Sequence, residues 1–289
     1  MTIQARKKEA ALNFTDNMSP ISAYVLGFLW ADGYVQKNRR KYDYNIKVNI
    51  QICDAEEIFP VLCKTGDWKY YCSTNKITNR TYACLRYSNK YLYQFLCDND
   101  FLIKSQVSPV KILNIIPNDL KHYWWRGYFD GDGYLSANPK TGAHCVDITS
   151  NYNQDWKFCE ELCGKLNIEF HSKTHKDNTH ANSHFYLVGK KNVYKFLHFI
   201  YKDRDLDNIG LSRKFDKFKS AVCFYTEQEK QGIGIENYKN KKFIIRKIGS
   251  FNCLYQAIDA RRKFIWEFKK DEWNKYYPHL SGYSKFSKL

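Results

Sequence analysis

Two aspartates, Asp32 and Asp132, occupy matching places in two similar stretches of this 289-residue chain. Each follows an apolar, aromatic-rich run and precedes the dipeptide Gly-Tyr. An aspartate in the last turn of a helix faces the negative end of the helix dipole, and two such aspartates side by side repel each other. A divalent cation between them would offset both effects, and carboxylate oxygens with water and phosphate suit Mg²⁺. The pair is a candidate centre for metal-dependent phosphodiester hydrolysis, although Asp-Gly is also an ordinary turn dipeptide.

The repeated stretches, 23–34 and 123–134, predict two helices that pack against each other. Small residues recur on one face of each helix at a spacing of four. Glycine inside a helix costs about 1 kcal/mol relative to alanine, so close approach of the two backbones is the expected reason for it. The predicted helix interface consists of Gly27, Ala31, Gly127 and Gly131. If the helices run parallel, their terminal carboxylates meet.

The ends of these helices carry recognisable signals. Ser19 is the expected N-cap of the first helix, with Pro20 at its first position. Asn118, after Pro117, is the candidate cap of the second helix. Gly33 and Gly133 stand where a left-handed C-terminal cap is expected.

Alternating strands are expected after each helix. Residues 44–52 predict a strand whose buried face comprises Ile46, Val48, Ile50 and Ile52. The opposite face carries amide and cationic side chains, which can pair with base edges in the major groove. An ordinary solvent-facing strand is the alternative. The candidate DNA-binding residues are Gln36, Arg39, Arg40, Asn45, Lys47, Asn49, Gln51, Arg80, Arg86, Asp147, Thr149 and Lys173.

The order of the expected elements is helix-strand-strand-helix-strand-strand-helix, twice. In the first half, strands from Tyr34, at 44–52, at 67–73 and at 80–88 alternate with helices at 54–64 and 89–98. In the second half, strands from Tyr134, at 143–150, at 168–175 and at 184–189 alternate with helices at 152–166 and 190–201, and a polar loop runs from His175 to Asn182. The predicted class is α+β, with a first half at 1–104, a linker at 105–118, a second half at 119–221 and a basic extension at 222–289.

The composition indicates a polyanionic partner. Forty-six Lys and Arg against 30 Asp and Glu give a formal charge of +16, spread along the chain. The sequence has no long apolar run, so we expect neither a membrane span nor a secretory signal. The 10 cysteines are scattered without a C-x-x-C pair, which favours reduced thiols in a reducing, cytosol-like compartment over a zinc site or a disulfide scaffold.

At the motif-like stretches Val25–Gly33 and Trp125–Gly133, the chain resembles the single-chain, two-motif LAGLIDADG homing endonucleases. The resemblance spans roughly residues 19 to 220. It implies parallel motif helices between two antiparallel sheets, which form a saddle over double-stranded DNA. It also implies Asp32 and Asp132 as ligands of Mg²⁺ or another divalent cation such as Mn²⁺. Ala31 and Gly131, in close contact directly before them, are expected at the same metal site. The expected activity is site-specific hydrolysis of both strands by a monomer.

The resemblance extends to a polar shell around the cleavage site. Gln51 matches a glutamine that often ends the second strand, where the second half has Thr149. Lys104 and Arg213 match cations that often follow the last helix of each half, with Lys214 a near alternative to Arg213. We expect Gln51, Lys104 and Arg213 to assist catalysis, because such cations stabilise a phosphate or polarise water.

The motifs also depart from the family pattern. Trp30 stands where the first motif usually has an acidic or small polar residue, and Leu26 and Arg126 stand where alanine is common. These positions concern packing and capping, and both acidic positions are intact.

Two other functions stay open from the sequence, namely an intron RNA maturase and a catalytically silent DNA-binding regulator. The extension at 222–289 faintly resembles small DNA-binding modules appended to some mobile endonucleases, and a structural cap on the second half is an equal alternative. We expect an additional DNA contact there that takes no part in the chemistry.

Overall fold

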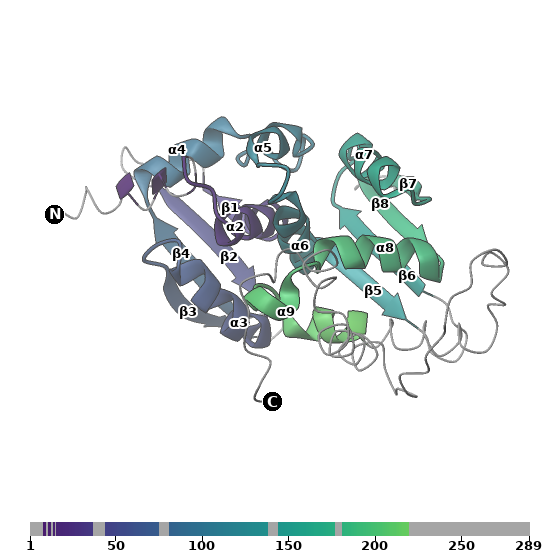
Figure 1. The fold of residues 1–289 in the computed structure, drawn as a ribbon. Coiled ribbons are helices and arrows are strands. Elements are labelled where there is room, and N and C mark those ends of the chain that lie inside the picture. The colour runs from purple at the N-terminus through teal and green to yellow at the C-terminus, as the bar shows by residue number, and fades with distance from the viewer. Residues whose placement is uncertain are drawn as a thin grey trace, which may run out of the picture. The chain divides into compact units, whose positions relative to one another are not determined.

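The computed structural model describes residues 8–9, 11–12, 14, 16–36, 44–74, 81–137, 144–176 and 181–219. Residues up to Phe218 form one compact unit. Its first half contains, in chain order, α2 (Pro20–Ala31), β1 (Gly33–Val35), β2 (Asn45–Ile50), α3 (Ile52–Cys63), β3 (Lys69–Thr74), β4 (Thr81–Ser88) and α4 (Lys90–Asp98) (Figure 1).

The second half repeats this order after a short linking helix, α5 (Val110–Ile115). It contains α6 (Lys121–Asp132), β5 (Gly133–Ala137), β6 (His144–Ser150), α7 (Lys157–Leu166), β7 (His171–Lys176), β8 (Ala181–Val188) and α8 (Lys190–Ile200). The turn-length helix α9 (Arg204–Asp207) and a helical segment from 212 follow. The predicted pair of αββαββα halves is confirmed, whereas the predicted extension at 222–289 lies outside the described residues.

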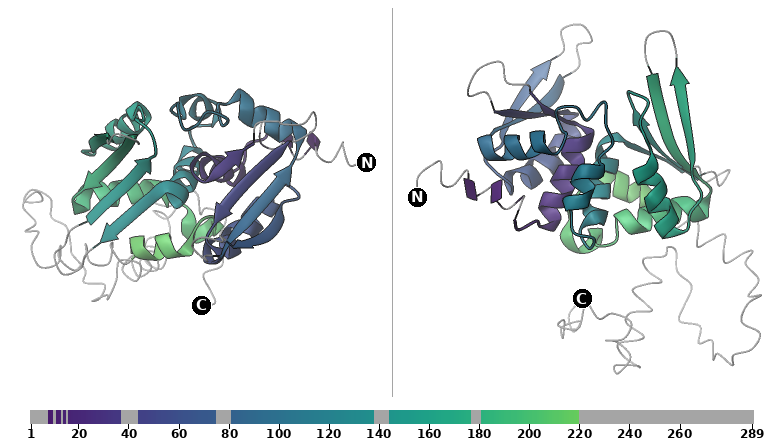
Figure 2. Two further views of the ribbon diagram at one scale, coloured as in Figure 1. Left: turned by 180° about the vertical axis from the view of Figure 1, so that it is seen from behind. Right: turned by 90° about the horizontal axis from the view of Figure 1, so that it is seen from above.

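Each half has one four-stranded antiparallel sheet, with the orders β1-β2-β4-β3 and β5-β6-β8-β7. The registers match, because Tyr34 pairs with Lys47 in the first sheet and Tyr134 pairs with Asp147 in the second. The alternation predicted for β2 is confirmed, since Ile46 is buried while Asn49 is exposed. Figure 2 shows α2 and α6 between the two sheets.

The two helices α2 and α6 touch along their glycines. A Cβ added to Gly27 would lie 2.0 Å from the carbonyl oxygen of Trp124, and one added to Gly127 would lie 2.1 Å from the carbonyl oxygen of Tyr24. Backbone therefore packs directly on backbone at the crossing. Toward the C-terminal ends Gly131 faces Ala31, so the helices run parallel, as the motif spacing predicted.

One of the two predicted N-terminal caps is confirmed and the other is wrong. The Oγ of Ser19 accepts from the amide of Ser22, as expected of an N-cap. Asn118, however, does not cap α6, which begins at Lys121 after Leu120 and has no side-chain cap. The physical reason is a turn in which the amide of Leu120 bonds to the carbonyl of Pro117, so that the helix starts two residues later than the cap signal predicts.

Gly33 and Gly133 are not left-handed caps. Gly133 has a φ of −83°, and the described glycines with positive φ are Gly189 and Gly210. Each motif glycine is instead the first residue of a strand, and neighbouring atoms leave no space there for a side chain. A Cβ on Gly33 would lie 2.4 Å from the carbonyl oxygen of Leu29, and one on Gly133 would lie 2.1 Å from the ring of Phe129.

Several predicted boundaries shift. Ile52 opens α3 rather than closing the preceding strand. The helix expected from 152 begins at Lys157, because Ser183 on β8 holds the preceding residues in a turn; its Oγ donates to the carbonyl of Tyr152 at 2.6 Å. Strands β7 and β8 continue to Lys176 and from Ala181, so they occupy part of the loop predicted between 175 and 182. The strand expected from 168 begins at His171.

The described cysteines, eight in all, are free thiols. None of the helices in the described part of the chain is both long enough and apolar enough to span a bilayer.

The helix contact predicts the effect of a single added methyl group. Gly27→Ala should lower the free energy of unfolding by about 3 kcal/mol, because overpacking against a backbone carbonyl cannot relax by moving a side chain. Thermal denaturation measures this. The matched control is Gly164→Ala in α7, where an added Cβ meets nothing within 4 Å. It should be neutral or stabilising, by up to about 1 kcal/mol. Equal effects of the two substitutions would contradict the packing described here.

Candidate active site at the ends of the paired helices

The two repeated aspartates lie together at the C-terminal ends of α2 and α6. Asp32 is the C-cap of α2, and Asp132 is the last residue of α6. Burial raises the pKa of Asp132 to about 7, and the neighbouring charge of Asp32 adds to that rise. Burial also raises the pKa of Asp32, against the opposing charges of Lys104 and Lys214. The site therefore holds two carboxylates that resist being charged at the same time.

The helix contact sets how close these acids come. A Cβ added to Gly131 would lie 2.3 Å from the Cβ of Ala31 and 3.3 Å from Oδ2 of Asp32. No side chain larger than hydrogen fits at Gly131 while Ala31 keeps its place. Ala31 and Gly131 thus form the predicted contact directly before the acids, and their predicted role at a metal stays a prediction.

Lys104 closes the end of α2. Its Nζ donates to the carbonyl oxygens of Leu29 at 3.3 Å and Trp30 at 2.6 Å, and also to that of Ala31. These carbonyls belong to the last turn of α2, and a cation suits the negative end of the helix dipole. Burial lowers the pKa of Lys104 to about 8, while the charges of Asp132 and Asp32 act to raise it.

Lys214 closes the end of α6 in the same way. Its Nζ donates to the carbonyl oxygens of Phe129, Asp130 and Gly133 at 2.6, 2.7 and 2.6 Å. Burial lowers its pKa to about 8, and the nearby charge of Asp130 opposes that shift. The structure thus places Lys214, the sequence alternative, in the position that corresponds to Lys104.

Arg213 lies beside this site and binds the first half, and its predicted part in catalysis stays a prediction. Its guanidinium makes two bonds to the carboxylate of Asp54 in α3, at 2.6 and 2.7 Å, and its side chain is 47% exposed. The adjacent amide of Ser212 donates to Glu57 at 2.8 Å. The segment that carries Lys214 is therefore tied to the first half. Conversely, the hydroxyl of Tyr152 in the second half donates to the carbonyl of Val107, which follows the first half, at 2.6 Å.

A buried network around Asp130 was missed by the sequence analysis. Its carboxylate accepts from the hydroxyls of Tyr24 and Tyr201 at 2.9 and 3.1 Å, and from the amide of Leu211 at 2.9 Å. Burial raises the pKa of Asp130. These bonds fix the approach of the chain to Lys214. The signal available in the sequence was the difference between the motifs, because Trp30 replaces this acid in the first one.

Arg126 anchors the same region from a fully buried position on α6. It donates to the carbonyls of Ile200 and Ile209 at 2.8 and 3.0 Å and to the carboxylate of Asp207 at 3.0 Å. Its departure from the small residue expected there therefore serves packing between α6 and the end of α8.

The remaining predicted residues lie on the sheets. Gln51 is exposed between β2 and α3, and its Oε1 is 3.7 Å from the Sγ of Cys53. The others share the polar face of each sheet, which is the face opposite the buried strand residues. On the first sheet these are Asn45, Lys47, Asn49 and Arg86, with Gln36 just after β1; on the second they are Asp147, Thr149 and Lys173. Arg39, Arg40 and Arg80 lie outside the described residues.

The donor set of the acid pair suits a hard divalent cation. It offers carboxylate oxygens and no sulfur or imidazole ligand, which is the preference of Mg²⁺ and Mn²⁺. Within the described residues no group of three or more His, Cys, Asp or Glu gathers around a point. The two acids would therefore need water and a phosphate oxygen to complete a coordination shell, which leaves room for a substrate.

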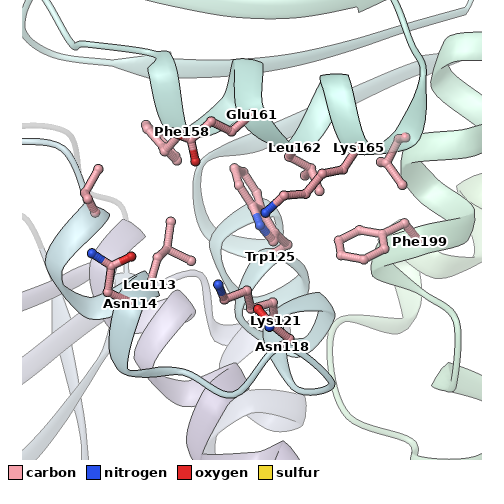
Figure 3. Close-up of a pocket in the computed structure, with 12 residues that line it drawn as sticks. Leu113, Asn114, Asn118, Lys121, Trp125, Phe158, Glu161, Leu162, Lys165 and Phe199 are labelled. Atoms are coloured by element: carbon pink, nitrogen blue, oxygen red, sulfur yellow. The ribbon is translucent and has the colours of Figure 1, made fainter.

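A cavity of about 340 Å³ lies elsewhere, between α5, α6, α7 and α8 (Figure 3). Trp125 and Phe158 line it, and Lys121 and Glu161 stand at it. None of the predicted site residues lines this cavity.

Comparison with known proteins assigns the second half. Residues 119–201 match the family model of the LAGLIDADG-like domain. This part of the chain is therefore similar to that family. The first half repeats its order of elements, its sheet topology and its glycine contact. The predicted resemblance is thus confirmed, with Asp132 closing the motif helix of the matched LAGLIDADG-like domain.

Solved structures of homing endonucleases are also similar. I-WcaI bound to its DNA recognition sequence is 15% identical, with 71% of this chain and 90% of that chain covered and a TM-score of 0.48. The meganuclease I-SmaMI bound to uncleavable DNA is 16% identical, with 74% and 92% covered and a TM-score of 0.47. Variants of I-DmoI are 16% identical, with 64% and 97% covered and a TM-score of 0.46. No curated protein sequence matches this chain.

The raised pKa of Asp132 predicts a stability cost in the metal-free protein. Its folded pKa of about 7 exceeds the unfolded value near 4, so ionisation destabilises the fold as pH rises between these values. Asp132→Asn should therefore raise the free energy of unfolding by on the order of 2 kcal/mol above pH 7. Below pH 4 the gain should vanish. Denaturant titrations across this range in EDTA measure it.

Asp119→Asn is the matched control, because Asp119 is an exposed carboxylate in the turn before α6. It removes a carboxylate without removing a buried charge, so it should not reproduce the gain of Asp132→Asn. A gain in Asp132→Asn that persists at pH 4 would mean that charge burial is not its source.

Proposed function

We propose that this chain is a site-specific homing endonuclease that hydrolyses both strands of a long double-stranded DNA target with Mg²⁺ or Mn²⁺. The observation that carries the proposal is the meeting of Asp32 and Asp132 at the contact of α2 and α6, where both pKa values are raised. Ionising two buried, neighbouring carboxylates destabilises the fold, and a cation bound between them would offset this cost.

The residues of the site have separate tasks in this proposal. Asp32 and Asp132 hold the cation. When bound there, a divalent cation supplies positive charge that promotes ionisation of water and stabilises the leaving oxygen. Lys104 and Lys214 keep the ends of α2 and α6 closed and add positive charge next to the scissile phosphates. Water is the nucleophile, so no covalent bond to the enzyme is needed.

DNA binding follows from charge and surface. A formal charge of +16 favours a polyanion, and the polar faces of the two sheets carry amide, cationic and acidic side chains suited to base edges. Because one chain supplies both acids and both sheets, a monomer can engage two unequal half-sites. The predicted DNA contacts Arg39, Arg40 and Arg80, and the extension at 222–289, would add to this surface.

The proposal predicts cleavage that depends on metal and on both acids. Incubation with DNA spanning the insertion site of the gene should give double-strand cleavage with Mg²⁺ and none with EDTA. Asp32→Asn and Asp132→Asn should each reduce the cleavage rate at least about 100-fold, because a ligand of the cation is lost, while DNA binding persists. Cleavage measured on gels and binding measured by mobility shift separate the two effects.

Undiminished cleavage in either variant would contradict the proposal. Binding without cleavage by the unaltered protein would favour a silent regulator. Intron splicing that survives both substitutions would instead favour an RNA role for the chain.

A second prediction separates the two neighbouring cations. Lys214→Met should lower the single-turnover cleavage rate by about 100-fold, because it removes a charge beside Asp32 and opens the end of α6. Arg213→Met should act mainly on stability, because it leaves Asp54 without its partner. Rates at saturating protein, together with melting temperatures, measure both. A larger loss of rate in Arg213→Met than in Lys214→Met would show that Arg213 is the catalytic cation.

A further inference from the structure

We propose that Lys47 and Asp147 read opposite hydrogen-bonding groups at corresponding base pairs of the two half-sites. Lys47 would select a guanine and Asp147 a cytosine, so the DNA target departs from two-fold symmetry at this pair of positions. The inference rests on the proposed function, because it requires the polar sheet faces to contact the major groove.

Lys47 and Asp147 occupy equivalent places in the two sheets. Each sits on the second strand of its sheet, β2 or β6, and pairs with the exposed tyrosine of the preceding strand. The neighbours of each along the strand are fully buried, so both side chains project from the polar face. The same sheet order in both halves makes the correspondence independent of any alignment of sequences.

In the described part of the chain, each of the two side chains has a hydrogen-bond partner. The Nζ of Lys47 donates to Oε1 of Gln36 at 2.8 Å, which leaves further donors on the ammonium group. Both carboxylate oxygens of Asp147 lie 3.2 Å from Nδ1 of His184. An ionised carboxylate only accepts, so Nδ1 is the donor in this pair. The acid keeps lone pairs available for a second donor.

The surroundings of the two positions differ in charge. Lys47 faces Arg86 on β4, and Lys69 on β3 lies next in the same row, so three cations line up across the first sheet. Asp147 faces Tyr186 on β8, whose ring stacks on that of His171 on β7 with centroids 5.2 Å apart. The first row suits phosphates as well as bases, whereas the second row presents an acid between aromatic rings.

An acidic side chain on a DNA-binding face weakens non-specific binding, because the phosphates repel it and it displaces no counterions from the DNA. Its presence there therefore requires an explanation. A base that offers a donor supplies that reason. In the major groove cytosine presents the N4 amino group, whereas guanine presents only the acceptors O6 and N7. Asp147, which only accepts, fits cytosine and rejects guanine. Lys47, which only donates, has the reverse preference.

The test is selection from a pool of randomised DNA duplexes, followed by sequencing of the bound fraction. Each half-site is read outward from the centre on its corresponding strand. The unaltered protein should enrich guanine at one position of the first half-site and cytosine at the same position of the second, each by about tenfold. Asp147→Lys should change that cytosine to guanine and make the two positions alike. Asp147→Asn, nearly identical in shape, should change it to adenine, which an amide pairs with in bidentate fashion.

Asp119→Lys is the matched control, because it makes the same change of charge at an exposed position at the N-terminal end of α6. It should raise overall affinity and leave the base preferences unchanged. Enriched sites whose base preferences are identical in the protein and both Asp147 variants would overturn this inference alone. Absence of any enriched site with the folded, unaltered protein would overturn the proposed function as well.

Discussion

At the crossing of α2 and α6, carbonyl oxygens of one helix occupy the space where the other would carry a side chain. This backbone contact at Gly27 and Gly127 decides the geometry of the ends of both helices, and therefore of Asp32 and Asp132. The two aspartates come together because no side chain separates the backbones of α2 and α6 at the crossing. The two acids are then buried and repel each other, and the positive charges of Lys104 and Lys214 moderate the electrostatic cost.

The two halves reach this common arrangement by different packing. In the first half, Trp30 packs edge-on against Phe101, with ring centroids 4.9 Å apart, shortly before the chain delivers Lys104. In the second half, Asp130 at the corresponding position binds two tyrosines and the amide of Leu211, shortly before Lys214. An apolar contact in one half and a polar network in the other thus precede a lysine that binds carbonyl oxygens at the helix end. Both halves place a lysine at the end of the helix, but different contacts hold the preceding chain in each half.

The sequence was sufficient wherever the signal is local or periodic. The strand alternation around Val48, the paired glycines and the matching aspartates each arise from short-range patterns that repeat, so the two halves and their elements were predictable. Signals that compete with a neighbour were misleading, as at Asn118, where the turn at Pro117 prevails. Choices that depend on distant partners were out of reach. The placement of Lys214, and not Arg213, against the carbonyls at the end of α6 depends on Asp54, which is 159 positions from Arg213, and on the network of Asp130.

Each half also fastens itself to the other beyond the helix contact. Arg213 and Ser212 hold Asp54 and Glu57 of α3, while Val107 receives the hydroxyl of Tyr152. The C-terminal segment of the second half, which carries Ser212 and Arg213, therefore packs as part of the first half. A chimaera that joins one half to a second half from another protein would lose these contacts, because the C-terminal segment would no longer meet its partner residues. Recombination between such repeats must therefore preserve the pairs at these tails as well as the motif helices, which narrows the routes by which a duplicated gene can exchange its parts.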